Sequence, residues 1–155
     1  MATLLASVAA AATQPGVPNC TVTWHTQALD HFNFAEPRTF KQRVLRHDGF
    51  YRPGGPILFY TGNEANVELY LNATGLMWEH AESFGAVLVF AEHRYYGESK
   101  PKPKPKEDGD ALDASAAHAS SVGGIIPGHL KKKGDYPYLT SEQAMADYAT
   151  LIREL

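Results

Sequence analysis

The chain has 155 residues, a formal net charge of −3 and 44% hydrophobic residues, a composition typical of one globular domain or part of one. No window holds about 18 consecutive apolar residues, which excludes an ordinary membrane-spanning helix. Seven of the 14 basic residues lie between Lys100 and Lys133, so the rest of the chain is acidic and we expect no nucleic-acid partner.

Residues 1–20 are expected to form a leader, because Leu4 to Ala12 is a short run of small apolar residues. A positively charged start is missing, so a weak signal peptide and an Ala-rich leader both stay open. Two glycosylation sequons, at Asn19 and Asn72, favour the secretory pathway, with Asn72 the better acceptor. Cys20 is the single cysteine, so it is free or pairs outside this chain.

Two outer strands are predicted over Val22 to Phe34 and Thr39 to Arg46, joined by a turn near Pro37. A third strand is predicted over Ile57 to Thr61, ending at Gly62. This apolar segment follows a Pro- and Gly-rich breaker, which sets its beginning.

An amphipathic helix is predicted over Asn66 to Ser83, ended by Gly85, because apolar residues recur there at helical spacing. Asn72 lies off the stripe that these apolar residues form along the helix, where a glycan is tolerated. Ala86 to Ala91 is an unbroken apolar run, typical of a strand buried on both faces of a parallel sheet. The stripe consists of Val67, Tyr70, Leu71, Thr74, Trp78 and Ala81.

The strand–helix–strand order of residues 57–91 predicts a parallel crossover.

Residues 100–135 combine Lys-Pro repeats with a tract rich in Ala, Ser and Gly. They are interpreted as an exposed insertion or as sequence foreign to the folded protein, and both interpretations stay open. The expected fold class is α/β, the N-terminal half of an α/β-hydrolase-type sheet that is incomplete, formed by residues 21–99 and 136–155.

A last helix is predicted to begin with a capping box, in which Thr140 is the N-cap and Gln143 reaches back to it. Its apolar face is predicted to comprise Ala144, Tyr148, Leu151, Ile152 and Leu155.

No Gly-x-Ser-x-Gly nucleophile motif occurs in the 155 residues. The segment from Gly97 to Pro101 comes nearest to this motif but lacks its second glycine. It also follows the strand predicted over Ala86 to Ala91, which is not the strand that precedes the nucleophile in this fold. Ser99 is therefore expected to order its own loop rather than attack a substrate. Metal-ligand spacings and a phosphate-binding loop are also missing, so we expect no metal and no cofactor.

The run Glu92-His93-Arg94-Tyr95-Tyr96-Gly97-Glu98-Ser99 follows the buried strand, where open α/β sheets build their sites. Together with Gly62-Asn63-Glu64 and the segment from Tyr138 to Ala144, it resembles the serine exopeptidase family of lysosomal Pro-X carboxypeptidase and dipeptidyl peptidase II. The resemblance covers Gln27 to about Ser99 and Tyr136 to Leu155.

The resemblance implies a serine peptidase that cleaves peptides beside proline in a lysosomal, vacuolar or extracellular compartment. In that family the catalytic serine, acid and histidine lie beyond the helix that Thr140 opens. We therefore expect an N-terminal fragment with no catalytic residue of its own, inactive alone. Carboxypeptidase and aminodipeptidase action both stay open. The alternatives are a non-catalytic product that binds peptides or a partner through its lysine tracts, and a fragment of an esterase.

Two loops are the candidate site. The loop Gly62-Asn63-Glu64 is expected to donate a backbone N–H to an oxyanion, or else to be a simple turn before a helix capped by Asn66. Glu64 either binds a substrate amine or complements the helix dipole.

The second loop is similar to the Asp-x-Arg-Gly-x-Gly-x-Ser loop of prolyl iminopeptidases, with Glu92 in place of Asp and Tyr96 in place of the first Gly. We expect Arg94 to form a buried ion pair that holds this loop, and His93 to pack within it. Tyr95 and Tyr96 are expected to supply its walls, and Gly97 and Ser99 belong to the same site loop.

Overall fold

The computed structural model describes residues 19–102 and 136–155. Almost all of the predicted leader and of the predicted insertion lies outside these residues. The elements of the described part are β1 (Thr21–Ala28), β2 (Thr39–His47), β3 (Ile57–Thr61), α1 (Val67–Ala73), α2 (Gly75–Phe84), β4 (Val87–Ala91) and α3 (Ser141–Ile152). In the described residues, no helix has the length and apolar character that a bilayer crossing needs.

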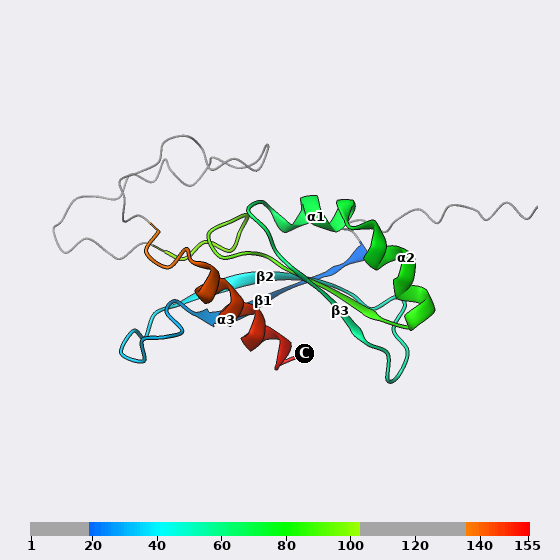
Figure 1. Ribbon diagram of the computed structural model, residues 1–155, viewed down its shortest axis with the longest axis horizontal. Coiled ribbons are helices and arrows are strands. Elements are labelled where there is room, and N and C mark those ends of the chain that lie inside the picture. Colours follow the sequence, from blue (N-terminus) through cyan, green and yellow to red (C-terminus); the bar gives the residue numbers. More distant parts are fainter. Residues whose placement is uncertain (1–18, 103–135) are drawn as a thin grey trace, which may run out of the picture.

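The four strands form one mixed sheet in the order β1-β2-β4-β3 (Figure 1). β1 with β2 and β2 with β4 pair antiparallel, while β3 and β4 pair parallel. The predicted parallel crossover is therefore confirmed, because α1 and α2 connect the two parallel strands. The α/β fold class is also confirmed.

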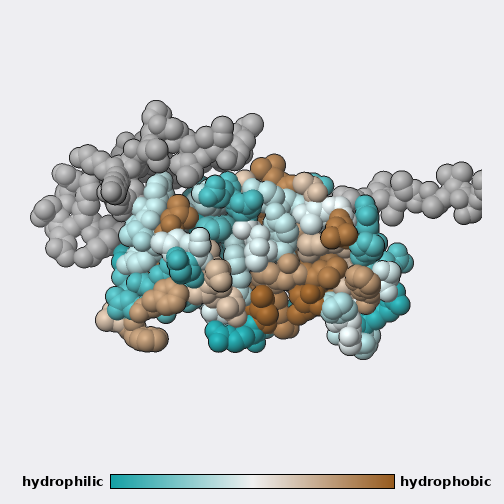
Figure 2. All heavy atoms as spheres, in the orientation of Figure 1, coloured by the Kyte–Doolittle hydropathy of each residue, from teal (hydrophilic) through white to brown (hydrophobic). Residues whose placement is uncertain are grey.

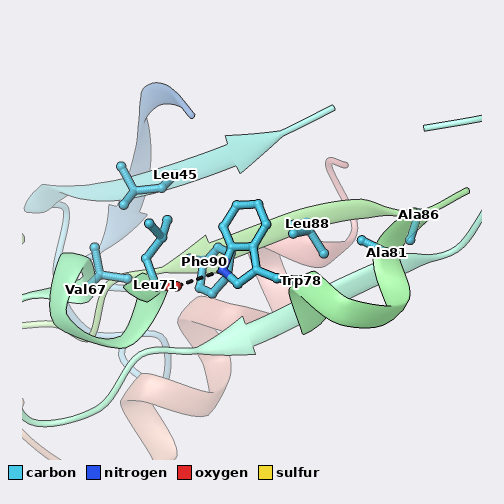
Figure 3. Packing of buried hydrophobic residues seen from close by; sticks show 8 residues of the cluster. All are labelled: Leu45, Val67, Leu71, Trp78, Ala81, Ala86, Leu88 and Phe90. Atoms are coloured by element: carbon cyan, nitrogen blue, oxygen red, sulfur yellow. Dashed lines mark hydrogen bonds between the residues drawn. The ribbon is translucent and has the colours of Figure 1, made fainter. Parts of the chain in front are cut away.

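Strand β4 lies at the centre of the packing and is buried along its whole length, as predicted. Alternate side chains of a strand point to opposite faces. Leu88 and Phe90 accordingly pack under α1 and α2 (Figure 3), whereas Val87, Val89 and Ala91 pack under α3. Helices thus cover both faces of the sheet and form two separate cores.

Helix α3 covers its face of the sheet only in part. Beside α3, apolar residues gather over β3 on the visible surface (Figure 2). Ile57 of β3 is 42% exposed, and Ile152 at the end of α3 and Leu155 beyond it are half-exposed. Both residues were predicted to belong to the apolar face of this helix. That prediction is wrong for Leu155, which lies outside the helix, and Ile152 is not covered by the sheet.

The helix predicted over residues 66–83 is wrong in one respect, since it is broken at Thr74, which has φ −89° and ψ 72°. A β-branched residue followed by Gly75 is a weak point for helix continuation. The break leaves Leu71 O without a helical N–H donor, whereas Tyr70 O still accepts from Thr74 N at 2.9 Å. Thr74 Oγ1 donates to Tyr70 O at 2.6 Å, and Trp78 Nε1 donates to Leu71 O at 2.7 Å (Figure 3).

The predicted ends of that helix agree with the structure. Asn66 is the N-cap, since its side chain accepts a hydrogen bond from Glu68 N. Gly85 closes α2 in the left-handed region with φ 61°.

The first predicted strand is too long, because β1 ends at Ala28. Beyond it the chain turns, with Asp30 Oδ1 accepting from Phe32 N and Asn33 Oδ1 accepting from Ala35 N, each at 3.0 Å. Side chains of Asp and Asn that bond two residues ahead form turns rather than strand. This local chemistry overrides the alternating pattern of the segment.

Helix α3 begins at the predicted N-cap, with Thr140 Oγ1 accepting from Gln143 N. The second half of the capping box is wrong. The Gln143 side chain instead reaches the β1–β2 connection, donating to Asp30 Oδ1 at 2.6 Å and accepting from His31 N at 3.0 Å.

Candidate functional site

Two loops meet where the parallel strands β3 and β4 end, as carboxyl ends of parallel strands do. Gly62 opens the first loop, and a Cβ at this position would overlap the carbonyl oxygen of Ala91 and the backbone nitrogen of His93. Tyr148 Oη donates to Gly62 O at 3.0 Å, which fixes the loop from the α3 side. Glycine is therefore required for the two loops to touch.

The Glu92 carboxylate holds the second loop together by accepting hydrogen bonds from residues of the same loop. The side chain is fully buried, and its Oε2 accepts from Glu98 N at 2.8 Å and from Ser99 N at 2.9 Å. Ser99 Oγ donates to the same oxygen at 2.8 Å. Gly97 has φ 51°, and a Cβ there would overlap this carboxylate. The loop is thus folded around one charge.

The other oxygen of Glu92 links this loop to the first one. Oε1 accepts from Arg43 Nη2 at 2.7 Å and from Val67 N, the first residue of α1, at 3.2 Å. Arg43 also donates to Asn66 Oδ1 at 2.6 Å and to Glu68 Oε1 at 2.8 Å. A buried carboxylate needs such a cation and several donors. Together these bonds hold residues 62–68 against residues 92–99.

Asn63 and Glu64 form the exposed tip of the first loop. Glu64 N donates to Asn63 Oδ1 at 2.8 Å, and Ala65 N donates to Asn63 O at 2.7 Å. Within residues 19–102 and 136–155, the backbone N–H of Asn63 has no hydrogen-bond partner. Of the residues predicted to face an oxyanion, Asn63 thus offers an amide open to a ligand.

Arg94 forms the buried ion pair that was predicted for it. The guanidinium contacts both carboxylate oxygens of Asp147 at 2.7 Å, and both side chains are fully buried. His31 Nε2 lies 2.7 Å from Asp147 Oδ1. Asp147 was not among the predicted site residues, although it lies three residues after Ala144 and four before Leu151 on the buried stripe of α3. An acidic residue on the apolar face of a predicted helix indicates a buried ion pair, and this signal is present in the sequence.

The remaining bonds of Arg94 reach three carbonyl oxygens. It donates to Leu29 O at 3.0 Å, Tyr138 O at 3.1 Å and Ala28 O at 3.3 Å. Its guanidinium carbon lies 5.2 Å from the ring centroid of Phe40. One side chain thereby fastens the β4 loop to β1, to the start of α3 and to β2.

Tyr95 is the only non-glycine residue with positive φ in the described part of the chain, at 71°. Counting along Asp-x-Arg-Gly from Glu92, the first glycine falls on Tyr95, so the expected match with Tyr96 is wrong. Glycine adopts such a left-handed backbone without strain, so Tyr95 holds a conformation for which glycine is the usual residue. Tyr96 is buried instead, and burial raises its pKa and that of Tyr95.

His93 packs within the loop, as expected. Its ring lies 5.3 Å from that of Tyr96 in a T-shaped contact, and Nδ1 is 2.7 Å from Arg94 O. Ser99 also orders its loop, since its Oγ accepts from Arg43 N at 2.8 Å besides donating to Glu92.

Both sequon asparagines are exposed, Asn72 on α1 and Asn19 just before β1, and glycosylation of either stays a prediction. Burial raises the pKa of the Cys20 thiol to about 11, which keeps it protonated at neutral pH. In the described ranges, no group of three or more His, Cys, Asp or Glu side chains has an arrangement that would hold a metal ion.

Comparison with known proteins places these features in a family. A family model described as serine carboxypeptidase S28 matches residues 27–116. Lysosomal Pro-X carboxypeptidase of Mus musculus is 47% identical over 135 residues, which cover 86% of this chain and 23% of that protein. The proteins of the same name from Bos taurus and Homo sapiens are 46% and 43% identical, covering 83% and 88% of this chain and 21% and 23% of theirs. The chain thus spans less than a quarter of the length of these relatives.

Proposed function

Because the chain belongs to the serine carboxypeptidase S28 family, a family of serine peptidases, we propose that it forms the oxyanion side of a site that hydrolyses peptide bonds next to proline. The substrate would be a peptide with proline near the cleaved bond, as the name of its Pro-X carboxypeptidase relatives suggests. The same relatives, named lysosomal, favour a lysosomal, vacuolar or extracellular location for this chain.

The observation that carries this proposal is the open amide of Asn63 at the end of β3. In hydrolases of this architecture, one oxyanion donor comes from the loop after the third strand. An amide fixed beforehand stabilises the developing charge without reorganisation in the transition state. The bonds of Arg43 and Glu92 provide such a fixed position.

The second loop would act as the frame of this site. Glu92, Gly97 and Ser99 hold its shape, and Arg94 anchors it to α3. His93, Tyr95 and Tyr96 form its aromatic part and would line the substrate side. Glu64 lies exposed beside Asn63, where it would meet a basic group of the peptide.

We further propose that the 155 residues do not hydrolyse peptides by themselves. They contain no Gly-x-Ser-x-Gly motif, and the nearest candidate, Ser99, is fully buried with its hydroxyl engaged on both sides. A fluorophosphonate probe should therefore leave the purified chain unlabelled. Stoichiometric labelling of one serine, lost on replacing that serine, would overturn this part of the proposal.

A chimera tests the oxyanion role directly. Residues 21–102 and 136–155 would replace the matching segment of mouse Pro-X carboxypeptidase, and Pro-X peptides would be the substrate. Asn63→Pro removes the N–H and should lower kcat by about 10²–10³-fold with little change in KM. The matched control Asn63→Ala keeps the N–H and should stay within a few-fold of the unmodified chimera.

Equal losses in both variants would contradict a role for the amide. Faster turnover of simple esters than of proline peptides by the chimera would favour the esterase alternative, because the fold alone does not set the substrate.

A further inference from the structure

The peptide group between Gly62 and Asn63 is hydrogen-bonded at one end and open at the other. Its carbonyl oxygen, Gly62 O, accepts from Tyr148 Oη at 3.0 Å. Its N–H, that of Asn63, has no hydrogen-bond partner among the residues that the structure describes. A trans peptide group is planar, and its C=O and N–H point in opposite directions. The hydroxyl that holds the carbonyl therefore also sets the direction of the open amide.

The other bonds of this loop act on neighbouring atoms. In the described segments, the buried ion pair that holds the loop reaches it from Asn66 onward. Asn63 O, which accepts from Ala65 N at 2.7 Å, belongs to the following peptide group. Tyr148 is thus the residue whose side chain bonds to the peptide group that carries the open N–H.

The Tyr148 ring is fixed in the core beneath α3. Only 7% of the residue is exposed, and it belongs to the same apolar cluster as Val89 and Ala91 of β4. Its ring lies 6.1 Å from that of Phe59 and 6.5 Å from that of His93, both in T-shaped contacts. A side chain that is locked on a helix by its neighbours places its polar end more precisely than a loop residue does.

The Tyr148 hydroxyl keeps its proton, because burial raises the pKa of this tyrosine well above its usual value, and the Asp147 carboxylate acts in the same direction. The O–H can therefore donate to Gly62 O from acidic to neutral pH. A phenylalanine would fill the same space in the core, so packing alone does not require the hydroxyl. What the hydroxyl adds is its bond to the loop.

We propose that Tyr148 is a positioning residue of the oxyanion site, which orients and polarises the Asn63 amide through the carbonyl of Gly62. The inference rests on the oxyanion role proposed above for Asn63. A hydrogen bond to the carbonyl end of a peptide group strengthens its N–H as a donor, because bonded groups polarise one another. An orientation that is fixed beforehand also spares the loop a rearrangement when charge develops on the substrate.

Turnover of Pro-X peptides by the chimera described above tests this role. Tyr148→Phe keeps the ring but removes the hydroxyl, and should lower kcat about three- to tenfold with little change in KM. In the Asn63→Pro background the N–H is already missing, so the same replacement should change kcat by less than about twofold. Tyr51→Phe is the matched control. It removes a half-exposed hydroxyl before the start of β3, at the opposite end of the parallel strands, and should leave kcat unchanged.

An NMR measurement reports on the hydrogen bond without any activity. In the 155-residue chain, an HNCO spectrum correlates the N–H of Asn63 with the carbonyl carbon of Gly62. Loss of the hydroxyl in Tyr148→Phe should move this carbon upfield, because the carbonyl loses its donor. Tyr51→Phe should leave the carbon in place.

Three results would overturn the inference. One is a Tyr148→Phe chimera that turns over as fast as the unmodified chimera. Another is an equal loss of kcat with and without Asn63→Pro, which is what a merely structural role predicts. The third is a Gly62 carbonyl carbon that does not move. All three are compatible with an Asn63→Pro variant slower than Asn63→Ala, whereas equal activity of those two variants would remove the oxyanion role itself.

Discussion

At the scale of single residues, buried charges define this molecule more than its apolar side chains do. Arg94, Asp147 and Glu92 are all fully buried, and each contacts segments that are distant in sequence. A buried charge is tolerated only when its partners are in place, so removing one partner is far more costly than replacing the pair. Stability should therefore depend strongly on these few positions.

Asp147→Asn is expected to destabilise the chain by about 3–5 kcal/mol, because Arg94 would keep its charge in the interior without a counter-charge. Urea unfolding followed by circular dichroism measures this loss. Glu154→Gln, at an exposed carboxylate just beyond the end of the same helix, should cost below about 0.5 kcal/mol. Similar losses in both variants would show that Arg94 does not depend on Asp147.

Gly97→Ala combines two costs, a left-handed backbone and an overlap with the Glu92 carboxylate. We expect a loss of roughly 2–5 kcal/mol in the free energy of unfolding. Gly54→Ala is the matched control, since Gly54 has φ 84° but nothing within 4 Å of an added Cβ, and should cost about 1–2 kcal/mol. If the two variants unfold at the same denaturant concentration, the loop is not packed around Glu92.

At the scale of elements, the break between α1 and α2 shows how a helix can be interrupted without losing its buried face. Val67, Leu71, Trp78 and Ala81 all remain in one core across the break. The freed carbonyl of Leu71 accepts a hydrogen bond from the Trp78 indole N–H. The break therefore depends on a polar contact inside an apolar cluster.

Trp78→Phe keeps an aromatic ring in the cluster but removes the N–H that binds Leu71 O. Leaving this buried acceptor unpaired, together with the smaller ring, should cost about 1–3 kcal/mol. The matched control Trp24→Phe, at an exposed indole, should stay within about 0.5 kcal/mol in thermal unfolding. Equal midpoints for both variants would contradict the capping role of the indole.

At the scale of the whole molecule, packing is uneven between the two faces and the two edges of the sheet. On the face under α1 and α2, Val22 and Trp24 of β1 stay about half-exposed. On the other face, α3 leaves apolar surface beside β3 uncovered (Figure 2). The connection between β1 and β2 is fastened to α3 by the side chains of Asp30 and Gln143. Two partly buried carboxylates of this connection, Asp30 and Glu36, also make the stability of the molecule depend on pH.

The Arg38 side chain lowers the pKa of Glu36 from its usual 4.5 to about 2. A lowered pKa in the folded state stabilises the fold fully above pH 4.5, and this contribution is lost as the pH falls from 4.5 towards 2. The difference in unfolding free energy between the unmodified chain and Glu36→Gln should therefore be constant from pH 7 to 5 and shrink below 4.5. A difference that grows as the pH falls would contradict the ion pair.

Asp30 should behave in the same direction, because the backbone N–H of Phe32 and the Gln143 amide lower its pKa. Neither carboxylate loses its contribution at the mildly acidic pH of a lysosome. This agrees with the compartment proposed for the chain.

Local patterns in the sequence were sufficient for the strands other than the end of β1, for the parallel crossover, for the caps at Asn66, Gly85 and Thr140, and for the family resemblance. Each of these depends on residues close together in the chain, whose spacing and side-chain chemistry restrict the backbone directly. The partner of Arg94, 53 residues away, and the contacts of Gln143 with Asp30 and His31 were decided only in three dimensions. Such pairs depend on how the loops and helices pack around β4, and no periodicity along the chain records that packing.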